Sequence, residues 1–202
     1  TKKVFFSSGY LHRFAFNNFS YRDISSSEEP ILKRENASIN QHFFMQEASL
    51  KLSPKSQIDA KINYVDSWRQ IPSVIGAVNN GEFQEDKQLK SILVYKNRST
   101  SWLNDVKLGY VREQMAYNDT ANDIFSNFLT NSYHSNYRST KNLSSIKAKF
   151  QGFISARIDQ ADSDYYNEVI SQNVMSTFLK WEHKINRFEY HFLLRQEFLD
   201  FE

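Results

Sequence analysis

The sequence predicts an all-β protein whose antiparallel up-and-down strands form part of a transmembrane β-barrel. Three observations lead to this prediction. Apolar and polar residues alternate along many segments, very short turns alternate with long polar connections, and 15% of the residues are aromatic. Aromatic side chains suit the pleated surface of a sheet. No run of about 18 apolar residues exists to form a membrane-spanning helix, so a chain of this kind would cross a membrane only as a barrel.

Strict alternation identifies the strands and gives each of them one apolar and one polar face. In one segment Ile58, Ala60, Ile62 and Tyr64 share a face, while Asp59, Lys61 and Asn63 point the other way. Similar patterns predict about nine strands, most of them longer than the five or six residues usual in soluble proteins. The expected strands are residues 3–16, 37–52, 57–66, 88–97, 102–117, 138–149, 153–160, 171–182 and 188–199.

The connections between these strands differ in length in a regular way. Short turns are expected at residues 53–56, 98–101, 151–152 and 183–186, and long polar loops at 17–35, 68–85, 118–137 and 162–170. One short helix is a further candidate, at residues 121–129 inside a loop. Outer-membrane barrels have short periplasmic turns and long extracellular loops. The asymmetry therefore favours a barrel over a soluble meander.

Composition excludes several classes of function. The formal net charge is +2, with Lys and Arg dispersed along the chain, so the sequence has no basic patch for nucleic acid. The absence of cysteine excludes disulfides, zinc knuckles and thiol nucleophiles. No catalytic motif places a nucleophile beside a base, and the expectation is that the chain is not an enzyme.

Aromatic residues gather near the ends of the expected strands, which suggests the two girdles that border the apolar band of a membrane barrel. Core or edge aromatics of a β-sandwich are the alternative, although Trp102 and Trp181 both flank short turns. The candidate girdle residues are Phe14, Phe16, Phe19, Tyr21, Tyr64, Trp68, Trp102, Tyr110, Tyr117, Tyr165, Tyr166 and Trp181.

Four carboxylates near one expected loop form a weak candidate site for Ca²⁺, which prefers oxygen ligands. These are Asp159, Asp162, Asp164 and Glu168. Their spacing does not match an EF-hand, so a solvated polar loop is the alternative interpretation. No other cofactor is expected.

Three segments resemble the barrel portion of TonB-dependent outer-membrane receptors, particularly the vitamin B12 and siderophore receptors of Bacteroidota. They are Asn17-Asn18-Phe19-Ser20-Tyr21, Arg34-Glu35-Asn36-Ala37 and residues 62–72, which read INYVDSWRQIP. The resemblance implies a 22-stranded barrel with an N-terminal plug. Residues 1–202 would then be a partial barrel of about nine strands, with the plug and the C-terminal strand outside this sequence.

The resemblance further implies uptake of a scarce large nutrient of the siderophore, haem or cobalamin class across the outer membrane. The partners would be outer-membrane lipid, the small-molecule ligand and TonB, which would act through the plug; no nucleic acid is expected. Loop aromatics would stack on the ligand, and arginines would meet its anionic groups. The candidate ligand-binding residues are Phe19, Tyr21, Arg22, Trp68, Arg69, Phe83, Phe125, Phe128, Tyr133 and Arg138.

A soluble, secreted β-sandwich or lipocalin-like binding module is the second interpretation of the same sequence. In a barrel, apolar residues such as Ile58 and Leu108 face lipid, whereas in a sandwich they face a dry core. Alternation along the strands is the same in both folds, so the sequence leaves this choice open.

Overall fold

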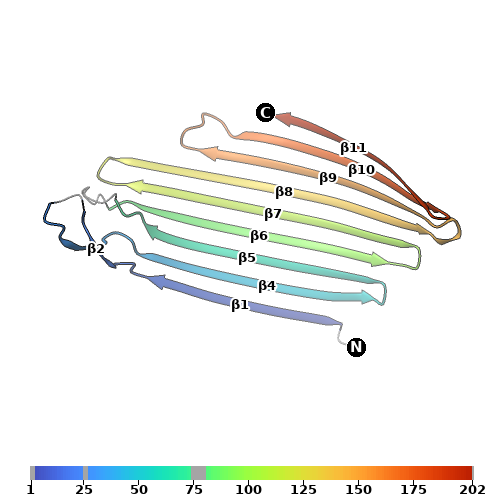
Figure 1. Ribbon diagram of the computed structural model, residues 1–202, viewed down its shortest axis with the longest axis horizontal. Helices are drawn as coiled ribbons and strands as arrows, with labels where there is room; N and C mark the ends of the chain where they lie inside the picture. The colour runs from blue at the N-terminus through green and yellow to red at the C-terminus, as the bar shows by residue number, and fades with distance from the viewer. Residues whose placement is uncertain (1–2, 25–26, 74–80, 202) are drawn as a thin grey trace.

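Nine strands form one antiparallel sheet in which neighbours in space are also neighbours along the chain (Figure 1). The computed structural model describes residues 3–24, 27–73 and 81–201. The sheet order is β1 (Val4–Ala15), β4 (Ile39–Ser53), β5 (Ser56–Gln70), β6 (Phe83–Arg98), β7 (Trp102–Asp119), β8 (Ile124–Leu143), β9 (Ala148–Ser163), β10 (Ile170–Ile185) and β11 (Phe188–Phe201). A separate ribbon pairs β2 (Ser20–Arg22) with β3 (Ile31–Lys33).

The prediction of an all-β, antiparallel up-and-down architecture is confirmed. The nine strands contain 12 to 20 residues each, twice or more the usual length in soluble proteins. Within the described residues the sheet is open, with β1 and β11 at its two edges. The described residues include no helix that is long and apolar enough to cross a membrane; a single 3-10 turn, η1 (Ser144–Ile146), is present.

A single layer of sheet has no interior, and almost no apolar side chain is buried. Among the described residues only Ala148 counts as a buried apolar residue. The accessible surface is 14329 Å² for 23.8 kDa, whereas a compact monomer of this mass exposes about 9,900 Å². The apolar side chains of the sheet must therefore be covered by something other than the described part of this chain.

The connection between β7 and β8 is a tight turn, so the predicted long loop at 118–137 and helix at 121–129 are both wrong. β7 continues to Asp119 and β8 begins at Ile124. Asp119 is buried, and its Oδ1 accepts hydrogen bonds from the backbone N–H groups of Ala121 and Asn122, both at 3.2 Å. Asp123 has a φ of 55°, a left-handed conformation that Asp tolerates better than most residues. These features close the turn within four residues.

Two of the predicted short turns are displaced. Gln151 and Gly152 lie inside β9, and the chain instead reverses through η1 and Lys147, whose φ is 49°. The turn expected at 183–186 is shorter and lies at 186–187, because β10 continues to Ile185 and Asn186 adopts a φ of 56°. The turns between β4 and β5 and between β6 and β7 lie where they were expected.

The asymmetry of the connections is confirmed for two of the four predicted loops. The segments 16–38 and 71–82 are long and lie at the end of the sheet opposite the four short turns (Figure 1). Parts of both, residues 25–26 and 74–80, lie outside the described residues. The other two connections at this end, 120–123 and 164–169, are shorter than the sequence predicted. We refer to the two ends below as the loop end and the turn end.

Replacing Asp119 with alanine should destabilise the sheet, because the N–H groups of the turn would lose their acceptor. We expect a loss of about 1–3 kcal/mol in the free energy of unfolding, measured by denaturant titration of the folded protein. Asp119→Asn keeps the Oδ1 acceptor and should lose less. Equal stability of the alanine variant and the parent would contradict this role for the carboxylate.

Candidate functional site

The register of the sheet divides its side chains between two unlike faces. Directly paired residues on neighbouring strands lie on the same face, so the pairings trace continuous rows across all nine strands. One row is Val4, Leu50, Ile58, Tyr95, Val106, Tyr137, Ile154, Thr177 and Gln196. The next row on this face is Phe6, Ala48, Ala60, Leu93, Leu108, Ser135, Ala156, Met175 and Phe198. Neither row holds a charged residue, and we call this side the apolar face.

The opposite side, which we call the charged face, has rows that interleave with these two. Its corresponding rows are Phe5, Ser49, Asp59, Val94, Lys107, Asn136, Ser155, Ser176 and Glu197, then Ser7, Glu47, Lys61, Ile92, Gly109, His134, Arg157, Val174 and Leu199. Six of these residues carry a full charge. In these four rows every charged residue therefore lies on one face.

The charged face also holds the ion pairs of the sheet. Among the described residues of the nine-stranded sheet, every Lys or Arg paired with a carboxylate lies on this face. Pairs between strands are Lys61–Glu47 at 2.7 Å, Lys96–Asp59 at 2.8 Å, Arg138–Asp105 at 2.6 Å, Lys149–Glu182 at 3.3 Å, Arg69–Asp86 at 3.6 Å and Lys90–Glu113 at 3.8 Å. Exposed pairs of this kind stabilise a fold little, by about 0–1 kcal/mol each. The position of these ion pairs is more informative than their energy, because it identifies the face of the sheet that suits contact with water.

Aromatic residues form a row across the apolar face near the turn end. Trp102, Lys141, Phe150, Trp181 and Phe192 are consecutive partners on β7 to β11. The ammonium group of Lys141 lies 4.8 Å from the ring centroid of Trp102, within cation–π range. Phe150 and Trp181 have centroids 6.5 Å apart. Two candidate girdle residues, Trp102 and Trp181, thus share one row, and Trp68 lies on the same face nearer the loop end.

Asn36 joins the two long connections at the loop end. Its side-chain amide donates hydrogen bonds to the carbonyl oxygens of Ile71, at 2.8 Å, and Glu82, at 2.9 Å. Ile71 and Glu82 also pair through their backbones, so Asn36 binds both ends of segment 71–82 from the neighbouring loop. Its φ of 51° is left-handed, a conformation in which Asn is enriched. Asn36 was not predicted from the sequence as a residue that organises the loops. An Asn in a polar loop was the signal that could have indicated it, because Asn side chains often bond to backbone groups in turns.

Seven of the predicted ligand-binding residues lie near the loop end, but they do not form one site. Phe19, Tyr21 and Arg22 belong to the loop with the β2–β3 ribbon, where Arg22 pairs with Glu29 at 3.4 Å. Trp68 and Phe83 lie on the apolar face with ring centroids 6.2 Å apart. The adjacent Arg69 lies on the charged face, and Phe125 is on the apolar face at the start of β8. Consecutive residues of a strand point to opposite sides, so Trp68 and Arg69 are on opposite faces.

The structure places the other three predicted residues in the body of β8 rather than in a loop. Phe128 is on the charged face, with its ring centroid 5.9 Å from that of Tyr165. Tyr133 is on the apolar face, 5.1 Å from the ring of Tyr110. Arg138 lies in the half of β8 nearer the turn end, bonded to Asp105. The expectation that a loop carries Phe128 and Tyr133 is therefore wrong.

The four carboxylates of the candidate Ca²⁺ site are not brought together. Asp159 and Asp162 lie on opposite faces of β9, and Asp159 pairs with Arg157 at 2.7 Å. Oδ2 of Asp164 accepts hydrogen bonds from the backbone and side chain of Asn127. In the part of the chain that the structure describes, no three His, Asp or Glu residues are grouped so that they could hold a metal ion.

Tyr117 makes a further contact at the loop end that the sequence did not indicate. Its hydroxyl donates to Oε2 of Glu82 at 3.0 Å. Partial burial, together with this carboxylate, raises the pKa of Tyr117 above its usual value of 10.0. The tyrosine therefore stays protonated and keeps donating at physiological pH, and it fixes β7 to the base of the 71–82 connection.

The function of this chain has to be argued from the geometry of its sheet and loops rather than from relatives. No protein-family model matches this chain, and no curated protein matches it in sequence. The structural features that bear on function are the apolar face with its two uncharged rows, the ion-paired charged face and the loop end that Asn36 holds together.

Asn36→Ala should loosen the loop end, because two backbone carbonyls would lose their donor and alanine disfavours a positive φ. We expect proteolytic cleavage within the two long connections to accelerate several-fold, while the strands stay resistant. Asn36→Gly is the matched control, since it tolerates the backbone conformation but removes the amide. If glycine protects the loops as well as asparagine does, the side-chain hydrogen bonds are not what holds them.

Proposed function

We propose that this chain is part of an outer-membrane β-barrel that acts as a TonB-dependent uptake receptor. The apolar face would contact lipid, and the charged face would line a water-filled lumen. The observation that carries this proposal is the segregation of charge between interleaved rows of the same strands. Apolar residues that face outward and polar residues that face inward are what a large transmembrane barrel requires.

The energetics of a bilayer account for this segregation. A Lys or Arg facing lipid at the middle of a membrane barrel costs about 2–4 kcal/mol, and the cost falls toward the interfaces. On the apolar face, Lys141 lies in the tryptophan row, where an interface is expected. Arg112 and Lys87 lie nearer the loop end, beyond the two uncharged rows. Long basic side chains at such boundaries can extend their charges toward the headgroups.

The alternative, a soluble β-sandwich or lipocalin-like module, would cover the apolar face with a second sheet. Two features favour lipid instead. The strands of 12 to 20 residues exceed the roughly 9–11 residues that a tilted strand needs to cross a bilayer. The row of Trp102, Phe150, Trp181 and Phe192 borders the apolar face as an interfacial girdle does. Because lipid cannot satisfy free backbone groups, further strands would pair with both edges of the sheet.

Transport in this proposal begins at the loop end. The connections 16–38 and 71–82 would capture a ligand of the siderophore, haem or cobalamin class, which then passes through the lumen after movement of a TonB-coupled plug. The resemblance of residues 17–21, 34–37 and 62–72 to such receptors supports this ligand class. Arg69, on the charged face, is better placed than Trp68 to meet an anionic ligand inside the lumen.

The first experiment is membrane fractionation of the native protein, with heat-modifiable gel mobility as the readout. Recovery in the outer membrane, together with a mobility shift on boiling, supports a folded barrel. A soluble protein without a shift contradicts the proposal and favours the sandwich.

Adjacent residues of β6 provide a sharper test of which face meets lipid. In a background with all three tryptophans changed to phenylalanine, Leu93→Trp places the fluorophore on the apolar face and Val94→Trp places it on the charged face. Dibrominated lipid quenches tryptophan on contact. We expect strong quenching of the Leu93→Trp variant in vesicles and little quenching of the Val94→Trp variant. Equal quenching of both, or of neither, would contradict a lipid-facing apolar face.

A further inference from the structure

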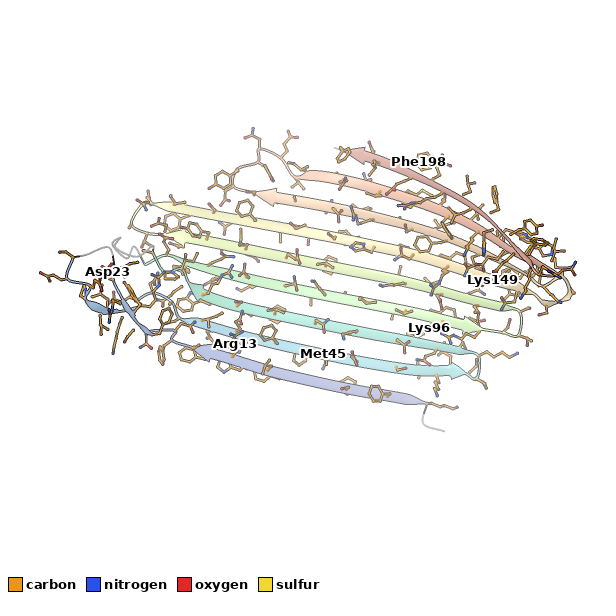
Figure 2. The ribbon with its side chains drawn as sticks, viewed as in Figure 1. Arg13, Asp23, Met45, Lys96, Lys149 and Phe198 are labelled. Carbon is orange, nitrogen blue, oxygen red and sulfur yellow. The ribbon has the colours of Figure 1, made fainter. Side chains whose placement is uncertain are left out.

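A groove at the turn end of the charged face is lined by five cations and by no carboxylate. It has a volume of about 520 Å³ and lies between the ends of β1, β4, β5 and β6. The cations are Lys3, Lys51, Lys55, Lys96 and Arg98. Figure 2 labels Lys96 near this end of β6. The site is concave, strongly positive and separate from the loop end, where ligand capture is proposed.

Most of these cations have no acidic partner among the described residues, unlike several cations elsewhere on the charged face. Within the described residues Lys96 pairs with Asp59, whereas Lys3, Lys51, Lys55 and Arg98 have no ion pair. Elsewhere on the same face, cations such as Lys61, Arg138 and Lys149 each lie within 3.3 Å of a carboxylate oxygen. The groove is therefore a place where positive charge is gathered without neutralisation, and an anion would complement it.

The turn that carries Lys55 is held by its own hydrogen bonds. The hydroxyl groups of Ser53 and Ser56 lie 2.7 Å apart, and Ser53 Oγ accepts the backbone N–H of Lys55 at 3.1 Å. The backbone N–H of Arg98 in turn bonds to the carbonyl oxygen of Lys55 at 2.7 Å. These bonds fix the backbone at Lys55 and Arg98, two of the cations without an ion pair. The conformational entropy that is lost when an anion binds is therefore smaller.

The width of the groove indicates the shape of its ligand. Four adjacent strands span about 14 Å at the usual spacing between strands, far wider than one phosphate or carboxylate group. In an extended polypeptide, alternate side chains lie about 7 Å apart on one side, so three acidic residues within five would span the same width. We propose that this groove binds an extended acidic segment of polypeptide through alternate carboxylates.

This inference does not depend on transport or on lipid. In the proposed barrel the groove would open into the lumen, which lipid does not reach, and in a soluble protein it would face solvent. Binding can thus fail while the protein fractionates as a membrane barrel, or succeed while it does not. The two proposals are separable by experiment.

The test is fluorescence anisotropy of a labelled ten-residue peptide of alternating Ser and Glu, titrated with the full-length protein folded in an uncharged detergent. We expect saturable binding that weakens as salt increases. The triple variant Lys51→Gln, Lys55→Gln and Arg98→Gln should weaken binding at least tenfold. The matched control, Lys107→Gln, Lys184→Gln and Arg187→Gln, removes the same charge from β7, β10 and the turn after β10, and it should change affinity less than twofold.

A second variant keeps the test decisive if neutralisation disturbs folding. Lys51→Glu, Lys55→Glu and Arg98→Glu should lose the Ser-Glu peptide and gain binding of an alternating Ser-Lys peptide, which a merely unfolded protein would not do selectively. Equal losses in the groove and control triples would overturn the proposal, as would equal binding of a Ser-Gln peptide. Stronger competition by inorganic tripolyphosphate, or by phosphatidylglycerol vesicles, than by unlabelled Ser-Glu peptide would also overturn it in favour of a phosphate site.

Discussion

The hydrogen-bonded ladder between consecutive strands holds the described part of this chain together, since no second layer packs against the sheet within those residues. In most domains a buried core specifies the fold, but here nearly every large apolar side chain remains accessible. The ladder also determines which residues share a face. A slip of one residue between two strands would exchange their apolar and polar sides. The ion pairs between strands, such as Lys61 with Glu47, join residues that this register brings within reach of one another.

The parts of the fold that alternation alone determines were predictable from sequence. Ile58, Ala60 and Ile62 alternate with charged neighbours, and the structure places them on one face of a single strand. The start of β8 was not predictable in this way, because Ile124 and Phe125 are adjacent and Ser and Asn occupy both faces after them. A polar stretch of this kind becomes a strand because its backbone pairs with β7 and β9, which is a tertiary effect.

The candidate site was harder to predict for the same reason. Nearness in sequence suggested that Trp68 and Arg69 act together, yet the pleat sends their side chains to opposite sides of the sheet. The contacts that do organise the loop end join residues far apart in the chain. Asn36 meets Glu82, and Glu82 meets Tyr117, across 46 and 35 positions. Only the strand register brings such partners together, and local composition contains no information about it.

The small net charge of +2 conceals opposite charges at the two ends of the sheet. The short turns include Lys55, Lys147 and Arg187 and no carboxylate, while the connections 120–123 and 164–169 carry Asp123, Asp164 and Glu168 and no cation. At physiological ionic strength such potentials decay over about 8 Å, a small fraction of the length of these strands. Each end therefore acts on its own surroundings. In the two proposals, the basic groove would attract anions that have already reached the turn end, and ligand selection at the loop end would be electrostatically independent of it.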